Sequence, residues 1–327
     1  MKIVLVCLSV LCVMAGCAES EQDHPPAEPE TSPEAQAPVD TETPEDAEPP
    51  AEVNAPAEAQ APVEAQDPPA IVEQAIEQPT TRAGAVVYEG FEYEDGGYDE
   101  PQSQSGSGVG WGESRWSATK NGIDHVLPGL TYGSLTQAGG TCTSVTSLWS
   151  DARRSVGTTL SDAGLMADGA TLWFSVVVDN SAAGPTQKTG FFLGSDGFSR
   201  TSDESGVNGG GNGIGLFSRN GGTFLAGAFA NGRAPGTDTG VSANSGPVLL
   251  VGQITWGTDG GNETLTIYTP NADLARGAAV RTTSFADMDQ STFNTVAVRL
   301  KENSVLDEIR FGASYNDVVG LLDPEAE

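Results

Sequence analysis

The segment Leu306–Asp317, which reads L-D-E-I-R-F-G-A-S-Y-N-D, gives the clearest indication of the fold in this chain. Its apolar residues recur at strand spacing, and small turn-forming residues follow them. We interpret it as a closing β-strand. Its expected partner is the opening strand, Val86–Tyr93, more than 200 residues earlier. This pairing would close one sheet with the two ends of the domain.

A strand period of two places Asp307 on one face of this segment with Ile309 and Phe311, and places Glu308 and Arg310 on the other. An aspartate on an apolar face must be hydrogen-bonded, because an unpartnered buried polar group costs free energy. We therefore expect backbone amides of a neighbouring strand or loop to donate to Asp307. We interpret Asp307, Glu308 and Arg310 as a fold signature and not as an acidic catalytic site.

The sequence pattern of residues 84–319 is typical of an all-β domain. Glycine-rich turns separate short apolar runs, and no convincing amphipathic helix exceeds two turns. Eleven strands in about 240 residues require two stacked sheets or a barrel, and we predict a two-sheet antiparallel β-sandwich. The predicted strands are Ala85–Tyr93, Gly108–Ser117, Leu130–Leu135, Thr171–Asp179, Gly190–Leu193, Gly213–Ser218, Phe224–Ala230, Val248–Trp256, Glu263–Tyr268, Asn294–Leu300 and Val305–Phe311.

Three of these patterns say more about position in the sandwich. Thr171–Asp179 is apolar on both faces, which is typical of a central strand covered on both sides. Asn294–Leu300 alternates, which predicts one buried and one solvent-facing side. A glycine-rich turn between Val248–Trp256 and Glu263–Tyr268 predicts a hairpin. A helical turn is expected within Asp151–Leu165.

The first residues predict export. Lys2 precedes an apolar run, Ile3–Gly16, which is shorter than the roughly 20 residues of a membrane-spanning helix and is typical of a signal peptide, residues 1–16. The sequence V-M-A-G-C that ends at Cys17 resembles the lipobox of bacterial lipoproteins, which implies lipid attachment at Cys17 and anchoring to a membrane. Ala18 then implies the outer membrane of a Gram-negative-type envelope. The alternative is plain secretion, with Cys17 incidental.

Residues 17–83 differ in composition from the rest of the chain. They are rich in Pro, Ala, Glu and Gln, contain no aromatic residue, and hold 17 acidic residues against one basic residue. Such a segment lacks the apolar surface to offset backbone ordering entropy. We predict a disordered acidic tether that spaces a folded domain from the envelope; a solvating tail without a specific partner is a compatible alternative. Residues 320–327 form a short acidic C-terminal tail.

The charge and the cysteines exclude several classes of function. The chain has 45 Asp and Glu against 15 Lys and Arg, a formal net charge of −30. Because this charge repels phosphates, we predict no nucleic acid partner. Cys7 and Cys12 lie in the signal peptide and Cys17 carries lipid, so Cys142 has no partner for an internal disulfide. We predict that Cys142 is a small, half-buried strand residue.

Seven motifs, in order, resemble the concanavalin A-like, laminin-G-like jelly-roll domains of planctomycete and verrucomicrobial surface proteins. The resemblance runs from about Val86 to Asp317 and implies a jelly-roll fold. It implies no particular function, because these domains are mostly uncharacterised and the fold serves many ends. The motifs lie at Tyr88–Tyr93, Gly108–Trp111, Leu130–Tyr132, Trp173–Ser175, Leu249–Ile254, Thr264–Pro270 and Leu306–Gly312.

Exposed aromatic rings would suit a carbohydrate ligand, because sugar faces stack on rings while fixed polar groups bind the hydroxyls. Core packing is the alternative for each candidate. The candidate ligand-binding residues are Tyr98, Trp111, Trp116, Trp149 and Trp256.

Calcium is the candidate ion. Asp259, Asn262 and Glu263 of the D-G-G-N-E turn offer hard oxygen ligands, as do the runs Glu94–Glu100 and Asp203–Asn208. None has the spacing of a known calcium loop, and solvated turns are the alternative. We predict no other cofactor.

We find no catalytic constellation in the sequence. The E-x-D-x-x-E run of laminarinase-like glycosidases is absent. Gln253-Ile254-Thr255 and the distal Tyr315 resemble the Q-I-H motif and tyrosine of alginate-lyase-like jelly rolls, but Thr255 cannot act as a base. We interpret His125 as structural.

We therefore predict a non-catalytic envelope domain for recognition or adhesion, with a glycan or another envelope protein as partner. Two alternatives stay open. One is a structural envelope module without a discrete ligand, and the other is a polysaccharide-active enzyme with an unrecognised site.

Overall fold

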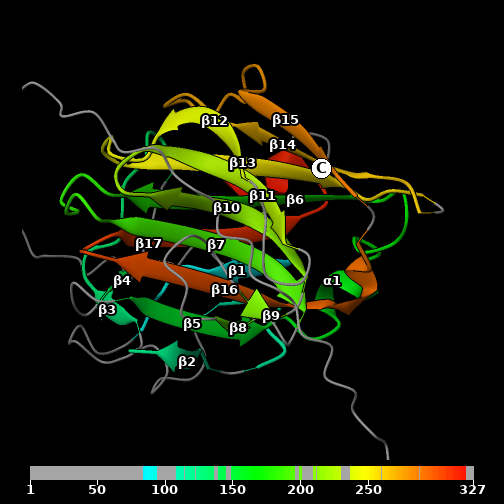
Figure 1. Cartoon of the computed structure of the whole chain (residues 1–327), viewed down its shortest axis with the longest axis horizontal. Coiled ribbons are helices and arrows are strands. Elements are labelled where there is room, and N and C mark those ends of the chain that lie inside the picture. Colours follow the sequence, from blue (N-terminus) through cyan, green and yellow to red (C-terminus); the bar gives the residue numbers. More distant parts are fainter. Residues whose placement is uncertain are drawn as a thin grey trace, which may run out of the picture. The chain divides into compact units, whose positions relative to one another are not determined.

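Strands dominate the computed structural model, which describes residues 84–93, 108–113, 115–121, 123–135, 139–144, 149–195, 199–200, 209–210, 212–229, 236–258, 260–286 and 288–321. They form two antiparallel sheets, so the predicted all-β sandwich is confirmed (Figure 1). The predicted signal peptide and tether lie outside the described residues, as does most of the predicted C-terminal tail. No helix in the described ranges is long and apolar enough to cross a membrane.

Sheet A contains both ends of the domain. In the described part of the chain it has eight strands, in the order β15-β14-β13-β6-β17-β4-β3, with β1 also paired to β17. Val87 of β1 lies opposite Phe311 of β17, which confirms the predicted pairing of the opening and closing strands. The bounds are β1 Val87–Glu89, β3 Asp124–Val126, β4 Thr141–Thr143, β6 Thr171–Asp179, β13 Val248–Thr255, β14 Glu263–Tyr268, β15 Arg281–Phe285 and β17 Val305–Gly312.

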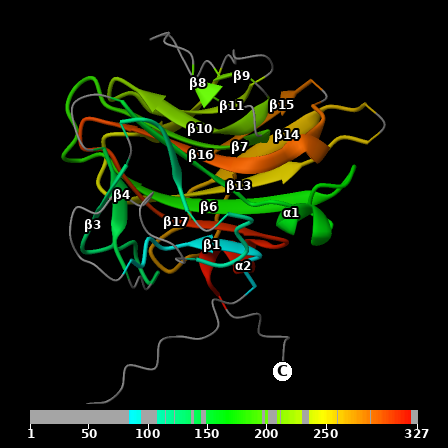
Figure 2. The ribbon, with the colours of Figure 1, turned by 90° about the horizontal axis from the view of Figure 1, so that it is seen from below.

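Sheet B packs on sheet A as the second layer (Figure 2). Its seven described strands follow the order β12-β11-β10-β7-β16-β5-β2, and a separate two-stranded ribbon pairs β8 with β9. The bounds are β2 Ser117–Lys120, β5 Ser150–Ser155, β7 Lys188–Ser195, β8 Ser199–Arg200, β9 Gly209–Gly210, β10 Gly213–Arg219, β11 Thr223–Phe229, β12 Thr237–Ser242 and β16 Phe293–Lys301.

Strand β6 is central in sheet A, between β13 and β17, and has the predicted bounds. Phe174 on its inner face packs on Phe191 of sheet B, with ring centroids 5.4 Å apart, inside the main core. Its outer face buries Trp173 and Val177 in a second apolar cluster. Both faces of β6 are therefore covered, as its sequence predicts.

The helices are short. Besides α1 (Thr159–Asp162) and the 3-10 turn η1 (Gln290–Thr292), the described residues contain α2, Tyr315–Val319. Ser314 and Asp317 form a capping box at the start of α2, and Gly320 ends it with φ 71°. Helix α2 packs on β17 and β6, so it covers part of the outer face of sheet A (Figure 2).

Two predicted strands are wrong and several short ones were missed. Gly108–Ser117 contributes only a bridge at Val109 before β2 begins, and Leu130–Leu135 is a turn closed by a bridge between Tyr132 and Leu135. The missed strands β2, β3, β4, β5, β12 and β15 are rich in polar residues. Their register comes from neighbours in the sheet, so their sequences lack the apolar alternation that marks a strand.

The segment around Arg153 and Arg154 is extended, which corrects part of the predicted helical turn. Both residues lie in β5, and the helical turn is α1, farther along the chain. The predicted solvent-facing side of Asn294–Leu300 is also wrong, because Thr295 is 2% and Arg299 is 7% exposed. Arg299 Nε lies 2.7 Å from Asp151 Oδ1, so this side buries an ion pair.

Strand β17 contains a bulge that the sequence pattern did not reveal. Glu308 has φ 55°, and the pairing of β17 with β6 shifts register between Asp307 and Arg310. Leu306 and Ile309 consequently lie in the same core cluster, although a strict period of two places them on opposite faces.

Candidate functional site

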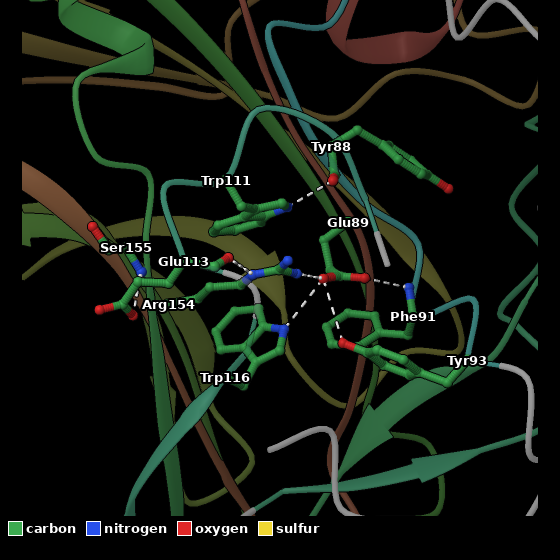
Figure 3. A network of polar contacts seen from close by, with 9 residues as sticks. All are labelled: Tyr88, Glu89, Phe91, Tyr93, Trp111, Glu113, Trp116, Arg154 and Ser155. Carbon is green, nitrogen blue, oxygen red and sulfur yellow. Dashed lines mark hydrogen bonds and ion pairs between the residues drawn. The ribbon is translucent and has the colours of Figure 1, made fainter. Parts of the chain in front are cut away.

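A buried carboxylate, Glu89, joins the two sheets (Figure 3). It is fully buried on β1 and forms an ion pair with Arg154 of β5, which belongs to sheet B. It also accepts hydrogen bonds from Phe91 N at 2.8 Å, from Trp116 Nε1 at 3.2 Å and from the Tyr93 hydroxyl at 3.5 Å. Both carboxylate oxygens thus make contacts within the folded domain, which indicates a structural role for Glu89.

The candidate ligand-binding residue Trp111 belongs to the same network. Its indole N–H donates to the Tyr88 carbonyl at 2.8 Å, and the Arg154 guanidinium lies 4.6 Å from its ring centre. Arg154 Nε in turn donates to the Glu113 carbonyl at 3.0 Å (Figure 3). Trp111 is half-buried, and one ring face is occupied by this arginine.

The remaining aromatic candidates differ in exposure. Trp116 and Trp256 are each 1% exposed, which is contrary to an exposed platform. The Trp256 N–H donates to Leu165 O at 2.7 Å. Trp149 is half-buried next to Lys188, whose Nζ lies 4.2 Å from its ring centre. Tyr98 lies outside the described residues.

The two calcium candidates that the structure describes, Asn262 and Glu263, face different surroundings. Glu263 is 1% exposed and points into the sandwich, where its Oε1 accepts from Met288 N at 3.1 Å. Asn262 is exposed, and Asp259 lies outside the described residues. Nowhere in the described ranges do three His, Cys, Asp or Glu side chains gather as a metal site would require.

The fold-signature residues form a second buried network. Glu308 accepts from the Tyr88 hydroxyl at 2.8 Å and from Arg310 Nη2 at 2.5 Å. Asp307 is 1% exposed and accepts from Leu130 N at 2.8 Å and from Glu308 N at 2.7 Å. The predicted backbone donors to Asp307 are therefore confirmed, one of them from a distant loop.

Replacing Asp307 with alanine should lower the free energy of unfolding by about 1–3 kcal/mol, because the buried Glu308 N–H and the half-buried Leu130 N–H lose their acceptor. Urea unfolding followed by tryptophan fluorescence measures this loss. The exposed variant Asp273→Ala is the control and should change it little. An unchanged unfolding midpoint in Asp307→Ala would contradict this structural role.

Asp307 should also make stability depend on pH. Burial, and secondarily the charge of Glu308, raise the pKa of Asp307 well above its usual value. A raised carboxyl pKa favours the protonated folded form, so the stability from Asp307 is full below about pH 4. It declines as pH rises toward the folded pKa. The variant Asp307→Asn should therefore gain stability relative to wild type as the pH rises above about 4. A stability difference that does not change with pH would refute the linkage.

His125 and Cys142 are both buried, on the neighbouring strands β3 and β4. His125 is 1% exposed and meets Tyr93 edge-on, with ring centroids 5.3 Å apart. Cys142 lies in β4 and is fully buried, more deeply than predicted. Burial, together with the charges of Asp307 and Glu89, raises the pKa of the Cys142 thiol well above its usual value. A thiol held in this neutral form is a poor nucleophile.

Another aromatic cluster, on the outer face of sheet A, was not singled out by the sequence. Trp173 of β6 stacks on Tyr268 of β14, with centroids 5.6 Å apart and planes at 29°. Tyr315 of α2 meets Trp173 edge-on at 5.8 Å. The exposed Arg276 lies over all three, with Cζ at 5.7, 5.3 and 5.8 Å from the ring centres of Trp173, Tyr268 and Tyr315. We call these four residues the Arg276 patch.

The loop that carries Arg276 is firmly held. The Asn271 side chain accepts from Asp273 N at 3.1 Å and from Ala275 N at 2.9 Å, which closes the loop on itself. Leu274 is buried with φ 63°, and its carbonyl accepts from the Tyr315 hydroxyl at 2.7 Å. A nonglycine residue in this conformation is retained only where its surroundings determine it. The position of Arg276 is therefore preorganised.

The charge on the Arg276 patch has no counterion within the described residues. No carboxylate there lies within ion-pair distance of Arg276, whereas Arg154, Arg299 and Arg310 each pair with one. Burial raises the pKa of Tyr315 to about 12, although Arg276 acts in the opposite direction. Tyr315 is thus neutral at physiological pH, and its hydroxyl donates a hydrogen bond to the Leu274 carbonyl.

Comparisons with known proteins support no family assignment. No family model matches the chain, and no curated protein matches it. Among solved structures, it is similar to a protein of unknown function from Shewanella oneidensis MR-1, at 15% identity and TM-score 0.38, over 72% of this chain and 91% of that chain. It is also similar to an endo-1,3-beta-glucanase from Streptomyces sioyaensis, at 11% identity and TM-score 0.36, over 69% and 95%.

An alginate lyase, vAL-1 from Chlorella virus, is a further similar structure, at 7% identity and TM-score 0.33, over 61% of this chain and 89% of that chain. These identities and scores are too low to support an inference about activity. The function must therefore be argued from the residues of this chain.

Proposed function

We propose that the chain is an envelope-anchored recognition protein that binds an acidic glycan at the Arg276 patch. The observation that supports this most directly is the exposed Arg276 guanidinium, which lies on three aromatic rings without a carboxylate partner in the described residues. Of the net charge of −30, −16 lies in residues 17–83, so the excess of acidic residues is concentrated outside the folded domain.

The geometry of the guanidinium favours a carboxylate ligand. A cation–π contact uses the positive charge of the guanidinium and does not consume its N–H groups as hydrogen-bond donors. Arginine and carboxylate form two parallel hydrogen bonds in this arrangement, and such charge-assisted bonds are about twice as strong as neutral ones. The preorganised loop reduces the entropy lost on binding.

The surrounding rings favour a sugar acid over a simple anion. Tyr268 and Tyr315 are half-buried, so part of each residue is accessible next to Arg276. A uronate combines a carboxylate with an apolar ring face, and the patch combines a cation with aromatic surface. The patch contains no histidine or acidic side chain, and a tyrosine with a pKa of about 12 stays protonated at neutral pH, so little of the basic tyrosinate form is present. We therefore propose binding without catalysis.

The envelope location is part of the proposal. It rests on the lipobox-like sequence at Cys17 and on the acidic composition of residues 17–83, and the resemblance to laminin-G-like surface domains agrees with it. Intact-mass analysis of the membrane fraction would detect diacylglycerol on Cys17. An unmodified protein in the growth medium would argue for plain secretion instead.

The variant Arg276→Ala should weaken uronate binding at least about tenfold, equivalent to about 1.4 kcal/mol, because the charged donor is lost. Isothermal titration of the full chain with oligomers of galacturonate, guluronate and mannuronate measures this. Neutral glucan oligomers test whether the carboxylate matters, and added salt should weaken binding.

Arg281→Ala is the matched control. Arg281 is also exposed, but it lies on β15 and makes no contact with the three rings of the patch. It should bind like wild type. If no uronate binds wild type, the recognition role fails and the structural-module alternative gains support. Release of shortened products during the titration would instead establish an enzyme.

A further inference from the structure

The outer face of sheet A continues beyond the Arg276 patch as two rows of polar side chains. In the first row, Trp173 lies opposite Gln253, Gln253 opposite Thr266, and Thr266 opposite Thr282. The second row, one pleat farther along the strands, follows the same four strands. Its members are Thr171, Thr255, Thr264 and Ser284.

These side chains point away from the core. The residues that alternate with them, Leu172, Ile254 and Leu265, are fully buried in the main core. Because successive strand residues face opposite sides, the two polar rows lie on the outer surface. Thr282 and Ser284 are exposed, and the other polar members are half-buried.

The outer face of sheet A changes from apolar and covered to polar and accessible at the Trp173–Tyr268 pair. On one side, Val177 and Leu249 are covered by Val318 of α2 and by Leu274. On the other side the side chains are short, polar and at least partly exposed. Gln253 connects the two halves, since its Oε1 accepts from the Tyr268 hydroxyl at 3.1 Å.

The two rows are uncharged. All seven polar members carry a hydroxyl or an amide, although 18% of the residues in the chain are charged. Exposed strands near a sheet edge usually carry charged side chains that oppose association. Hydroxyls and amides can both donate and accept hydrogen bonds, which suits the hydroxyl groups of a sugar chain.

The dimensions indicate a ligand longer than one sugar. Neighbouring strands are about 4.8 Å apart, so the row from Trp173 to Thr282 extends across about 14 Å of surface. Thr266 Oγ1 and Thr282 Oγ1 lie 3.0 Å apart, which fixes both side chains as part of one continuous surface.

We infer that the Arg276 patch is one end of an extended binding face, on which an acidic polysaccharide lies across β6, β13, β14 and β15. This inference rests on the proposed function and adds that the ligand is a polymer. Arg276 binds a carboxylate of one sugar unit, and Gln253, Thr266 and Thr282 bind hydroxyls of the units that follow.

Chain length is the test. Full-chain protein is titrated with galacturonate, guluronate and mannuronate, each as monomer, dimer and tetramer. Affinity should increase at least about tenfold from monomer to tetramer for the uronate that binds. Thr282→Glu places a negative charge at the far end of the first row, and should lower tetramer affinity at least about fivefold while leaving the monomer unchanged.

Ser245→Glu is the control, because it adds the same charge at an exposed site in the turn between β12 and β13. It should leave both affinities unchanged. Equal affinity for monomer and tetramer in wild type, or a tetramer affinity insensitive to Thr282→Glu, overturns the extended face. If Arg276→Ala still weakens binding at least about tenfold in that case, the proposed function stands. Absence of binding to any probe overturns both.

Discussion

Replacing Arg154 with methionine should lower the free energy of unfolding by about 3–5 kcal/mol, because the buried Glu89 would lose its arginine partner. Glu89 is fully buried, and it forms its ion pair with Arg154, which is 3% exposed. Because the pair joins β1 to β5, the loss should loosen the contact between the two sheets. Urea unfolding monitored by tryptophan fluorescence would measure it, since Trp111 and Trp116 adjoin the pair.

The double variant Glu89→Gln/Arg154→Met separates charge from packing. Glutamine retains an acceptor for Phe91 N and removes the charge, so the double variant should be more stable than Arg154→Met alone. Arg276→Ala is a control for arginine loss at the surface and should change stability by less than about 0.5 kcal/mol. A double variant less stable than the single variant would show that the buried charge is not the dominant cost.

The second large effect is expected for Glu308→Ala, which should also destabilise by about 3–5 kcal/mol. Arg310 is 6% exposed and would lose its carboxylate partner, and the Tyr88 hydroxyl would lose its acceptor. Alanine would still occupy the left-handed conformation of Glu308, with φ 55°, so the bulge remains strained. Chemical unfolding of the purified variant measures the loss.

Two further variants identify which part of Glu308 matters. Glu308→Gln keeps an acceptor for Tyr88 but leaves Arg310 without a counterion, so most of the loss should remain. Tyr88→Phe removes one hydroxyl and should lose only about 0.5–1.5 kcal/mol. If Tyr88→Phe proved as harmful as Glu308→Ala, the hydroxyl and not the ion pair would dominate this network.

The architecture was predictable because apolar runs of strand length, separated by turn-forming residues, mark buried strands. Thr171–Asp179 has its predicted bounds, and the pairing of β1 with β17 agrees with the expectation. The short polar strands were not predictable, because neighbours and not their own side chains determine their extended state. The bulge at Glu308 was hidden for a related reason: a single left-handed residue leaves no trace in composition.

The Arg276 patch could not be read from the sequence. Its members come from β6, from β14, from the following loop and from α2, and only the fold brings them together. Each looks ordinary in its own segment: a strand tryptophan, a strand tyrosine, a loop arginine and a tyrosine after a turn. The sequence did offer one signal. Trp173 and Tyr268 lie within two of the motifs of the resemblance, and assigning the aromatic residues of those motifs to one face of the sheet would have placed these two together.

The position of β1 has a mechanical consequence. A pull on the chain before Gly84 reaches the domain first at β1, where Val86 N donates to Phe311 O at 2.8 Å. Beyond that bond, Glu89 connects the strand to Arg154 in sheet B. The pull is therefore resisted by both layers of the sandwich. The backbone hydrogen bonds between β1 and β17 must break first, and the buried ion pair then still attaches β1 to sheet B.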